Sequence, residues 1–489
     1  MECQSFGGWN QALVLLLLSS TAILLFFASD RGDGVGGGVS NPIASPSDLT
    51  SSLSLRSPKR TPRPLLDQFP RTLHQEPDRL VLQTKKSKER SRRGVEEELA
   101  RARRAIRRAA AAAAAESSRG NASGNVFHGE DVPLAAIYRN PAAFFQSYVE
   151  MEKRFKVYVY EEGEPPLVHE GPCKDIYTTE GRFIEELEQQ QQEEEGGVRT
   201  WDPARAHAFF LPFSVAKMVR YVYKDQSWDQ APIKRFVNDY LRVIASKHPF
   251  WNRTAGADHF MLSCHDWGPH ASRANQELYR NSIRALCNAN TSEGFLPNKD
   301  VSIPEIHLHD GNIPRQLLST PFPDLSDRPY LAFFAGGNHG PIRPLLLHHW
   351  KGRHADLPVY EYLPRGLDYY SFMLKSRFCL CPSCHEVASP RIVEAIYAEC
   401  VPVLISESYA LPFGDVLRWE AFSVSVPVAE IPRVREVLER VGEEELRRLR
   451  EGVKAVRRHF VLNHPAKRFD AFNMILHSVW LRRLNVKLN

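Results

Sequence analysis

Short apolar runs alternate with amphipathic or polar stretches along the chain from Phe155 onward. Each run is five or six residues long and rich in Val, Ile, Phe and Tyr, which is typical of buried strands. Strands separated by helical stretches in this way form parallel sheets, so the pattern predicts an α/β fold. The predicted strands are Phe155–Tyr160, His207–Pro212, His259–Ser263, Tyr330–Ala335, Phe378–Pro382 and Val401–Ile405.

The segment Lys375–Ser406 has the clearest strand–helix–strand pattern. It predicts a buried strand, a loop, and a helix to about residue 399 with Ser389 as N-cap before Pro390. Nucleotide phosphates bind at such helix starts beyond the strand ends. Arg391 adds positive charge there, and Glu394, one turn on, could accept hydrogen bonds from a ribose. The alternative is a plain capped helix with a solvated Glu394.

A glycine-rich turn follows a second buried strand, within Leu331–Trp350. Glycines at such a turn let the backbone approach a ligand closely, and an arginine near the next helix start could offset the charge of a diphosphate. The spacing matches neither a dinucleotide-binding motif nor a Walker loop, so the turn alone is weak evidence. The candidate binding residues of this segment are Gly336, Gly337, His339, Gly340 and Arg343.

Polar residues end a third predicted strand, within Asp258–His270. His265 and Asp266 are candidates for a general base, because polar groups at the carboxyl end of a strand face a cleft in α/β folds. Trp267 offers a flat face of the kind on which sugars stack. The alternative is that the His and the Asp only tie down a turn.

The front of the chain contains 17 consecutive uncharged and mostly apolar residues, Ala12–Ala28. This length is at the short end for a membrane span and suits the thinner membranes of the early secretory pathway. A cleaved signal peptide is the alternative, but no Lys or Arg precedes the segment. Since nearly all of the mass follows it, we predict a type II membrane protein with a luminal body.

Glycosylation motifs and cysteines agree with this orientation. Asn-x-Ser/Thr motifs occur at Asn121, Asn252 and Asn290, all after the apolar segment. One cysteine precedes the segment and seven follow it. Because seven is odd, at least one luminal thiol stays free or pairs between chains.

Charge is concentrated between residues 29 and 130, where 19 Lys and Arg oppose 12 Asp and Glu. Although the whole chain has a formal charge of +5, the remainder is therefore slightly acidic, which argues against a nucleic-acid-binding domain. Composition predicts a disordered basic stem here, with Arg101–Glu116 as a solvated helix that lacks an apolar stripe. Contact with an anionic polymer is the alternative function of this stem.

The proline-rich stretch Pro304–Pro329 is the predicted crossing between two halves of the body. Beyond Arg433 the pattern is helical, with one apolar face formed by Ile475, Val479, Trp480 and Leu484. The predicted organisation is a cytosolic tail (1–11), an anchor (12–28), a stem (29–130), an N-terminal domain (131–310), a C-terminal domain (311–432) and helices packing back on the body (433–489).

The strings FKVYVYEEGEPPLVHEGP, DHFMLSCHDWGP, LCNANTSEGF, FFAGGNHGPIRPLLL and CPSCHEVASPRIVEAIYAECVPVLIS resemble the exostosin-like glycosyltransferases of plants, over about residues 155–441. The resemblance implies two facing Rossmann-like domains (GT-B type), a nucleotide-sugar donor in the C-terminal domain and an acceptor glycan in the N-terminal one. It also implies an inverting mechanism, a Golgi type II location and a role in building cell-wall polysaccharides such as pectin or hemicellulose. Hetero-oligomers with other glycosyltransferases are a further possibility.

One position departs from the family pattern. The family usually reads Cys-Pro-Ser-Gly where this chain has Cys381-Pro382-Ser383-Cys384. If the backbone there needs a positive φ, Cys384 costs strain of about 1 kcal/mol or more. The triplet Cys379, Cys381 and Cys384 also suggests zinc, but it overlaps a predicted buried strand and lacks a His pair.

Inverting glycosyl transfer requires a base for the acceptor hydroxyl and compensation for charge on the departing diphosphate. Asp-x-Asp, which holds a metal in many transferases, is missing from the sequence, so we expect a UDP-sugar substrate without a metal cofactor. Arg343, Arg391 and the helix starts after Gly340 and Ser389 would balance the diphosphate. Glu394 would anchor the ribose, Trp267 would contact the acceptor, and Asp266 or His265 would act as base.

Two other functions remain open at the level of the sequence. The chain could be a non-catalytic glycan-binding or scaffold subunit of a polysaccharide synthase complex. It could also be a secreted lectin-like protein, which would require cleavage of the N-terminal segment.

Overall fold

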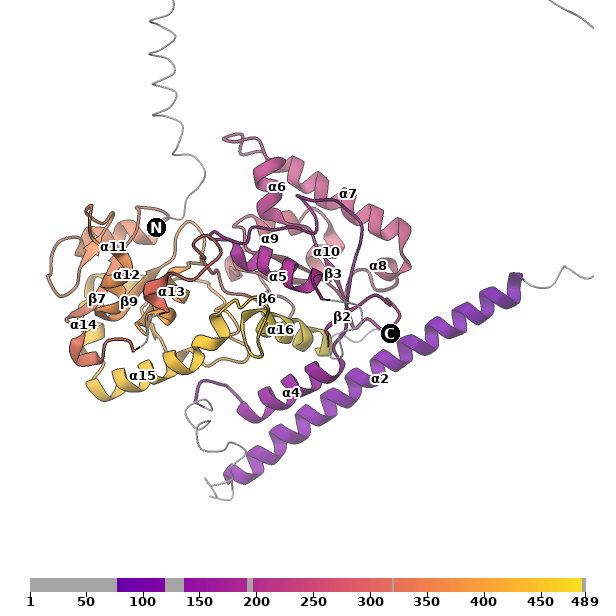
Figure 1. Ribbon diagram of the computed structural model, residues 1–489, viewed down its shortest axis with the longest axis horizontal. Coiled ribbons are helices and arrows are strands. Elements are labelled where there is room, and N and C mark those ends of the chain that lie inside the picture. The colour runs from indigo at the N-terminus through magenta and orange to yellow at the C-terminus, as the bar shows by residue number, and fades with distance from the viewer. Residues whose placement is uncertain (1–76, 119–135, 191–196, 319–320, 486–489) are drawn as a thin grey trace, which may run out of the picture. The chain divides into compact units, whose positions relative to one another are not determined.

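The computed structural model describes residues 77–118, 136–190, 197–318 and 321–485 (Figure 1). Residues from Lys88 onward belong to one compact unit, whose architecture is given below. The apolar segment Ala12–Ala28 and the motif at Asn121 lie outside the described residues. Among the helices of the described ranges, none combines the length and the apolar character that a membrane crossing needs.

Two parallel sheets organise this unit. The first has the order β2-β1-β3-β4-β5-β6 and the second has the order β11-β10-β9-β7-β8, and all strand pairs in both are parallel. The strands of the first sheet are β1 (Val157–Val159), β2 (Arg199–Thr200), β3 (Ala208–Leu211), β4 (His259–Ser263), β5 (Ile283–Leu286) and β6 (Val301–Ser302). Those of the second are β7 (Tyr330–Ala335), β8 (Val359–Tyr360), β9 (Ser376–Pro382), β10 (Val401–Ile405) and β11 (Val424–Ser425).

Both sheets reverse their winding next to their first strand. In the second sheet, β7 lies between β8 and β9, so the chain winds in one direction from β7 to β8 and in the other from β9 to β11. In open α/β sheets, ligands bind beyond the carboxyl ends of the strands at such a reversal. This arrangement of two sheets is consistent with the expected GT-B type.

Helices cover the sheets because their apolar stripes need burial. On α7, for example, Ile233, Val237, Leu241 and Ile244 recur at helical spacing and are all buried. The helices that precede β7 in the chain are α4 (Pro141–Arg154), α5 (Thr178–Glu188), α6 (Val215–Tyr221), α7 (Ala231–Lys247), α8 (Pro249–Thr254), α9 (Gly268–Ser272) and α10 (Gln276–Arg280). Those that follow β7 are α11 (Ile342–Trp350), α12 (Tyr369–Leu374), α13 (Arg391–Tyr397), α14 (Val434–Glu439), α15 (Glu443–Val456) and α16 (Ala471–Asn485).

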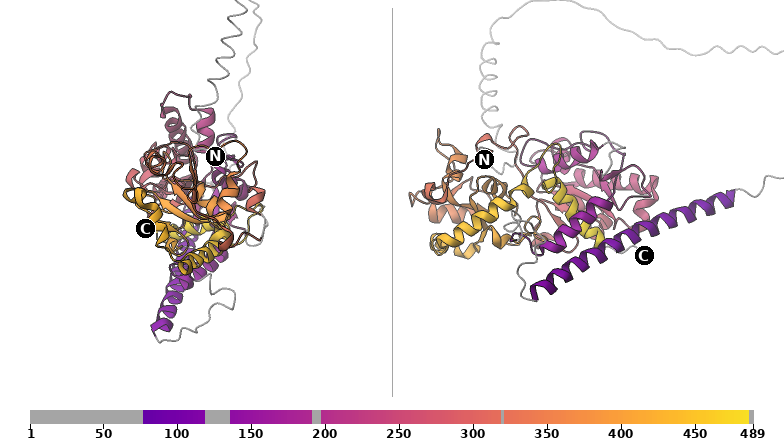
Figure 2. Two further views of the ribbon diagram at one scale, coloured as in Figure 1. Left: turned by 90° about the vertical axis from the view of Figure 1, so that its left-hand side faces the viewer. Right: turned by 60° about the horizontal axis from the view of Figure 1, so that its bottom comes forward.

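The last two long helices pack on different sheets (Figure 2). The first, α15, lies against β10 and α13, whereas α16 lies against β5, β6, α4 and α5. The predicted apolar face Ile475, Val479, Trp480 and Leu484 is buried. The stretch Pro304–Pro329 runs from the first sheet to the second, as expected. The exact domain boundaries stay a prediction.

The prediction for the stem was wrong in part. Helix α2 runs over Pro77–Ser118, and its residues Leu99 and Ala102 are fully buried in the core, with Val95 and Ile106 packed beside them. The spacing of these four residues forms one helical face, which a window starting at Arg101 cuts in half. Glu96 adds an ion pair with the buried Arg483. The stem helix is therefore attached to the folded body rather than wholly solvated.

Strand bounds match the predictions at β4, β7 and β10, differ by one or two residues at both ends of β1 and β3, and differ by two residues at the start of β9. The sequence did not predict β5, because the buried Arg284 interrupts its apolar run. Its guanidinium donates through Nε to Asp300 Oδ1 at 3.0 Å, and this pairing permits burial.

Two disulfides join neighbouring strands. Cys264 at the end of β4 pairs with Cys287 at the end of β5, and Cys379 in β9 pairs with Cys400 before β10. Cys173 and Cys381 have free thiols, in line with the expectation from the odd number. Because Cys379 is already bonded, the three-cysteine zinc set is not available. Cys384 does not have a positive φ, so the strain considered for this position does not arise.

Candidate active site

The two loops that leave the reversal point of the second sheet touch each other. One follows β7 and contains Gly336–Gly340, and the other follows β9 and contains Cys384. Gly340 has φ +68°, and a Cβ there would lie 1.9 Å from the Cys384 carbonyl oxygen. Only glycine adopts this positive φ without strain and also leaves room for the Cys384 carbonyl oxygen. The structure thus brings together two segments that the sequence indicated separately.

The Arg391 side chain extends from the start of α13 to the carboxyl end of β7, at this reversal point. Its guanidinium donates from Nε and Nη2 to the Ala335 carbonyl oxygen, at 3.2 and 2.9 Å, and lies over the Phe334 ring. A Cβ on Gly336 would stand 2.3 Å from Nη2, so glycine is required for this approach. The arginine of the second loop is therefore fixed at the carboxyl end of β7.

Arg343, in the first turn of α11, is fully buried close to Arg391. Its Nη1 donates to the Gly337 carbonyl oxygen at 3.4 Å. Burial, and then the charge of Arg391, lower the pKa of Arg343 to about 9, so it is still cationic at neutral pH. A diphosphate has the charge and the oxygens to accept hydrogen bonds from these two guanidinium groups.

Glu394 lies on α13 and is 3% exposed, which rules out the solvated alternative. Its Oε2 accepts a hydrogen bond from the Tyr369 hydroxyl at 3.0 Å, whereas its Oε1 has no hydrogen-bond partner among the described residues. A buried acceptor without a donor fits the recognition of a hydroxyl pair such as that of a ribose.

The predicted N-cap was wrong. The first helical residue is Arg391, Pro390 occupies the cap position, and no side chain caps the helix. The hydroxyl of Ser389 is buried and makes no hydrogen bond with the described part of the chain. The helix also ends at Tyr397, two residues earlier than expected.

Asp266 follows β4 in the first sheet. Burial raises its pKa to about 6, with a hydrogen bond from Tyr177 offsetting part of the rise and the charge of Glu293 adding to it. A carboxyl that titrates near neutral pH suits a general base.

His265 is a weaker candidate for the base. Its Nδ1 accepts a hydrogen bond from the Trp267 backbone N–H at 3.0 Å, so it does tie down the turn. Burial lowers its pKa to about 3, which leaves the ring neutral and weakly basic.

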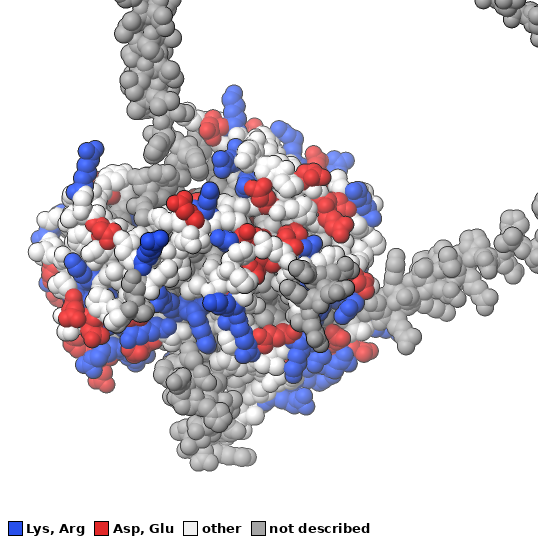
Figure 3. All heavy atoms as spheres, viewed as in Figure 1, with Lys and Arg blue, Asp and Glu red and all other residues white. Residues whose placement is uncertain are grey.

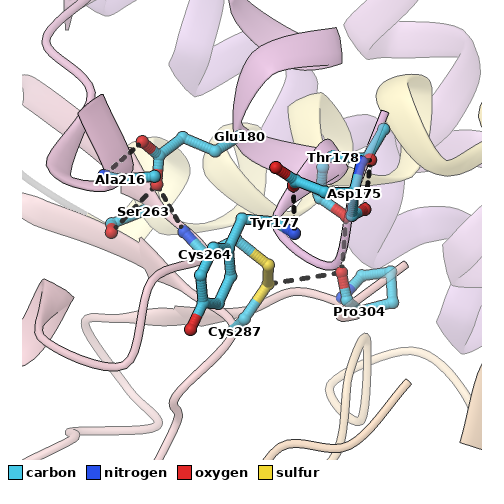
Figure 4. Close-up of a disulfide and its surroundings, with 10 residues drawn as sticks. Asp175, Tyr177, Thr178, Glu180, Ala216, Ser263, Cys264, Cys287 and Pro304 are labelled. Atoms are coloured by element: carbon cyan, nitrogen blue, oxygen red, sulfur yellow. Dashed lines mark hydrogen bonds between the residues drawn. A yellow bond between two sulfur atoms is a disulfide. The ribbon is translucent and has the colours of Figure 1, made fainter. Parts of the chain in front are cut away.

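A buried carboxylate fixes the end of β4 that carries Asp266 (Figure 4). Glu180, fully buried on α5, accepts hydrogen bonds from the Cys264 N–H at 2.9 Å and the Ser263 hydroxyl at 3.1 Å. It also accepts from the Ala216 N–H at 3.1 Å and from the hydroxyl of Ser214, the N-cap of α6. One side chain therefore joins β4, α5 and α6.

Two further carboxyl groups near Asp266 were missed by the sequence analysis. Glu386, from the loop after β9, accepts a hydrogen bond from Asn288 Nδ2 at 2.8 Å, and Asn288 also donates to the Asp266 carbonyl oxygen at 3.0 Å. Burial, with Glu293 and Asp266, raises the pKa of Glu386 to about 7. Asn288 thus links residues that lie after strands of different sheets.

Glu305 is the second of these carboxyl groups and comes from the crossing between the sheets. It is 4% exposed, and burial together with Asp266 raises its pKa well above the ordinary value, while Arg343 and Arg391 lower it. It therefore lies within electrostatic reach of both the candidate base and the two arginines. The sequence did contain one indication of Glu305, because it is a charged residue within the otherwise apolar run Ile303–Ile306. The run did not indicate where its side chain would point.

Three side chains could hold a metal ion. His307, His309 and Glu394 each offer one ligand atom, and these atoms lie within 4.8 Å of one another. Burial lowers the pKa of His307 to about 4, so it is neutral and able to coordinate. Since Glu394 belongs to this group, a metal and a ribose would compete for it.

The remaining predicted residues lie as follows. Trp267 is half-buried and its ring meets that of Tyr223 at 4.8 Å, in an edge-to-face arrangement. His339 packs near His385, with ring centroids 5.5 Å apart. Asn252 is exposed on α8, and Asn290 is half-buried as the cap of a short 3-10 helix, so their glycosylation stays a prediction.

Comparison with known proteins agrees with this arrangement. The family model for the exostosin GT47 domain matches residues 151–441. A probable glycosyltransferase of Arabidopsis thaliana is 56% identical over 408 residues, which cover 83% of this chain and 82% of the relative. Another from the same plant is 57% identical over 357 residues, covering 73% and 67%. A probable glucuronosyltransferase of Oryza sativa subsp. japonica is 28% identical over 352 residues, covering 67% and 80%.

The matched residues include both loops at the reversal point, Asp266 and the crossing that carries Glu305. The buried arginines, the carboxyl groups and the parallel sheets thus lie within the matched family domain. The chain belongs to the exostosin GT47 family and is a glycosyltransferase.

Proposed function

We propose that the protein transfers a sugar from a UDP-sugar to a cell-wall polysaccharide such as pectin or hemicellulose, with inversion at the anomeric carbon. The observation that carries the proposal is the fixed position of Arg391 on Ala335, beside the buried Arg343, at the reversal point of the second sheet. Three of its relatives from Oryza sativa subsp. japonica carry the name of a probable glucuronosyltransferase, which supports sugar transfer.

The proposed step uses residues of both sheets. Asp266 takes the proton of an acceptor hydroxyl, and the hydroxyl oxygen forms a bond to the anomeric carbon as the bond from that carbon to the diphosphate oxygen breaks. A single attack of this kind inverts the anomeric centre. Arg343 and Arg391 balance the negative charge that develops on the departing UDP, and Glu394 binds the ribose hydroxyls.

The proposal includes no metal cofactor. The two arginines supply positive charge where a metal-dependent transferase would place a divalent ion. The group formed by His307, His309 and Glu394 is the position at which this part of the proposal can be tested.

We further propose a Golgi location with a luminal body, anchored as a single-pass type II protein. The two disulfides support this location because such bonds persist in oxidising compartments. We also propose that the protein assembles with other glycosyltransferases and does not bind nucleic acid.

A screen of UDP-sugars against an array of plant polysaccharides tests the function. We expect transfer for one donor class, and we expect Glu394→Ala and Arg343→Ala to abolish it. Near-native circular dichroism and thermal midpoints of both variants would show that the fold survives. Wild-type activity in both variants would refute the donor site. Retained glycan binding without any donor binding in the native chain would favour a non-catalytic subunit instead.

A further inference from the structure

A tryptophan lies almost fully in solvent on the loop between α6 and α7. Trp228 is 80% exposed, the largest value among the exposed large apolar residues of the described chain. Figure 1 shows this loop, next to the label α6, projecting from the lobe that contains the first sheet. Tryptophan and tyrosine are enriched at binding interfaces, because each side chain offers a large apolar face and one polar group.

The backbone of the loop has a defined conformation at Trp228. Trp228 and Gln226 both have positive φ, 54° and 60°, which non-glycine residues adopt at a cost. The Trp228 backbone N–H donates to the Tyr223 hydroxyl at 2.9 Å, and the Ser227 N–H donates to the Lys224 carbonyl oxygen at 3.1 Å. These bonds keep closed the strained turn that presents the Trp228 ring to solvent.

One hydrogen bond and two ring contacts connect this surface to the candidate base. Tyr223, whose hydroxyl accepts the Trp228 backbone N–H, also packs its ring edge-to-face on Trp267, with centroids 4.8 Å apart. Trp267 follows Asp266 directly in the chain and also meets His265 at 5.6 Å. The three residues Trp228, Tyr223 and Trp267, here named the aromatic strip, therefore lead away from Asp266 over the first lobe.

Charges around the strip favour an uncharged ligand. On the loop, Lys224 is outnumbered by Asp225 and Asp229, which does not favour an acidic ligand, and charges of both signs are interspersed over the face that Figure 3 shows. At the inner end, the carboxyl groups of Asp266 and Glu386 would repel a polymer of acidic sugars. Aromatic rings bind the apolar C–H faces of pyranoses, which a neutral polysaccharide presents repeatedly.

We propose that the aromatic strip binds outer sugar residues of a neutral polysaccharide acceptor, several sugars away from the reacting hydroxyl. This inference rests on the proposed function, since Asp266 marks the place of that hydroxyl. The strip accounts for an exposed indole that the catalytic step itself does not use.

Affinity gel electrophoresis of the purified full-length chain tests the strip without requiring transfer. Soluble xylan and xyloglucan are the neutral probes, and polygalacturonate is the acidic probe. We expect the neutral probes to retard the native chain, Trp228→Ala to lose at least tenfold in affinity, and Trp228→Phe to retain most of it. Tyr223→Phe, which removes only the hydroxyl that holds the Trp228 N–H, should give an intermediate loss.

The results separate this inference from the proposed function. UDP affinity measured by calorimetry should be the same in Trp228→Ala and in the native chain. If transfer is absent but binding depends on Trp228, the strip stands and the enzymatic proposal fails. Equal binding of neutral probes by the native chain and Trp228→Ala, stronger binding of polygalacturonate, or no retardation by any probe would overturn the strip.

Discussion

Arg391, at the start of α13, donates two hydrogen bonds to the carbonyl oxygen of Ala335, at the end of β7. The helix α13 follows β9, and the second sheet reverses its winding between β9 and β7. A cation is thereby held where ligands bind in sheets of this kind, before any ligand arrives. Preorganised charge of this sort stabilises a leaving group without a reorganisation cost during the reaction.

Replacing Gly336 with alanine should displace Arg391. The new Cβ would lie 2.3 Å from Nη2, so the guanidinium has to leave the Ala335 carbonyl oxygen. We expect UDP affinity, measured by calorimetry, to fall at least tenfold, because a charge-assisted hydrogen bond contributes about 1.5–3 kcal/mol.

The matched control is Gly94→Ala on α2, where a Cβ meets nothing within 4 Å. This variant should bind UDP like the native chain. Unchanged UDP affinity in Gly336→Ala would show that Arg391 does not serve the donor.

The rate of glycosyl transfer should rise with pH along an acidic limb of the pH–rate profile near pH 6. Burial raises the pKa of Asp266 to about 6, and the base works only as the carboxylate, so activity is lost as pH falls below this value. Asp266→Asn should reduce kcat by about 100-fold or more and remove the limb. The measurement is kcat/KM between pH 4.5 and 8.

Neighbours of Asp266 should move this limb in opposite directions. Tyr177→Phe removes a hydrogen bond to the carboxylate and should shift the limb to higher pH. Glu293→Gln removes a negative charge that raises the pKa of Asp266 and should shift the limb to lower pH. A limb that survives unchanged in Asp266→Asn would assign the base to another carboxyl group, with Glu386 and Glu305 next in line.

Chelation should leave transfer unchanged. The proposed mechanism balances the diphosphate with Arg343 and Arg391, so dialysis against EDTA has no ion to remove. Steady-state rates before and after dialysis give the comparison. Loss of activity with EDTA, recovery with Zn²⁺ or Mn²⁺, and loss of that recovery in His307→Ala would instead establish a metal centre at His307, His309 and Glu394.

Removing the Glu180 carboxylate should destabilise the lobe that contains the first sheet. Glu180→Ala leaves buried donors of Ser214, Ser263 and Cys264 without an acceptor. Each unsatisfied group costs about 1–3 kcal/mol, so we expect a loss of at least 3 kcal/mol in urea unfolding.

The control for this change is Glu443→Ala, which removes an exposed ion pair with Arg377. Exposed pairs contribute about 0–1 kcal/mol, so its unfolding midpoint should stay near the native one. Similar midpoints for Glu180→Ala and Glu443→Ala would contradict the role given to Glu180.

Local pattern determined much of the fold. The bounds of β4, β7 and β10 follow from apolar runs, and the α/β class follows from their alternation with helices. The stem helix shows the limit of this reasoning: Leu99 and Ala102 are buried only because α4 and α16 belong to the same core as they do. A short stripe in an alanine-rich and arginine-rich sequence does not reveal which surface it covers.

The sequence by itself determined which residue types are available for chemistry: the glycine turn after β7, Arg343 and Arg391, Glu394, and the His265-Asp266 pair. Only the tertiary structure decided which of them meet. Arg391 reaches Ala335, and Glu386 reaches Asn288, because parallel strands distant in the chain end at the same edge of a sheet. The pKa of Asp266 is likewise a property of its buried surroundings, which residues from several elements create together.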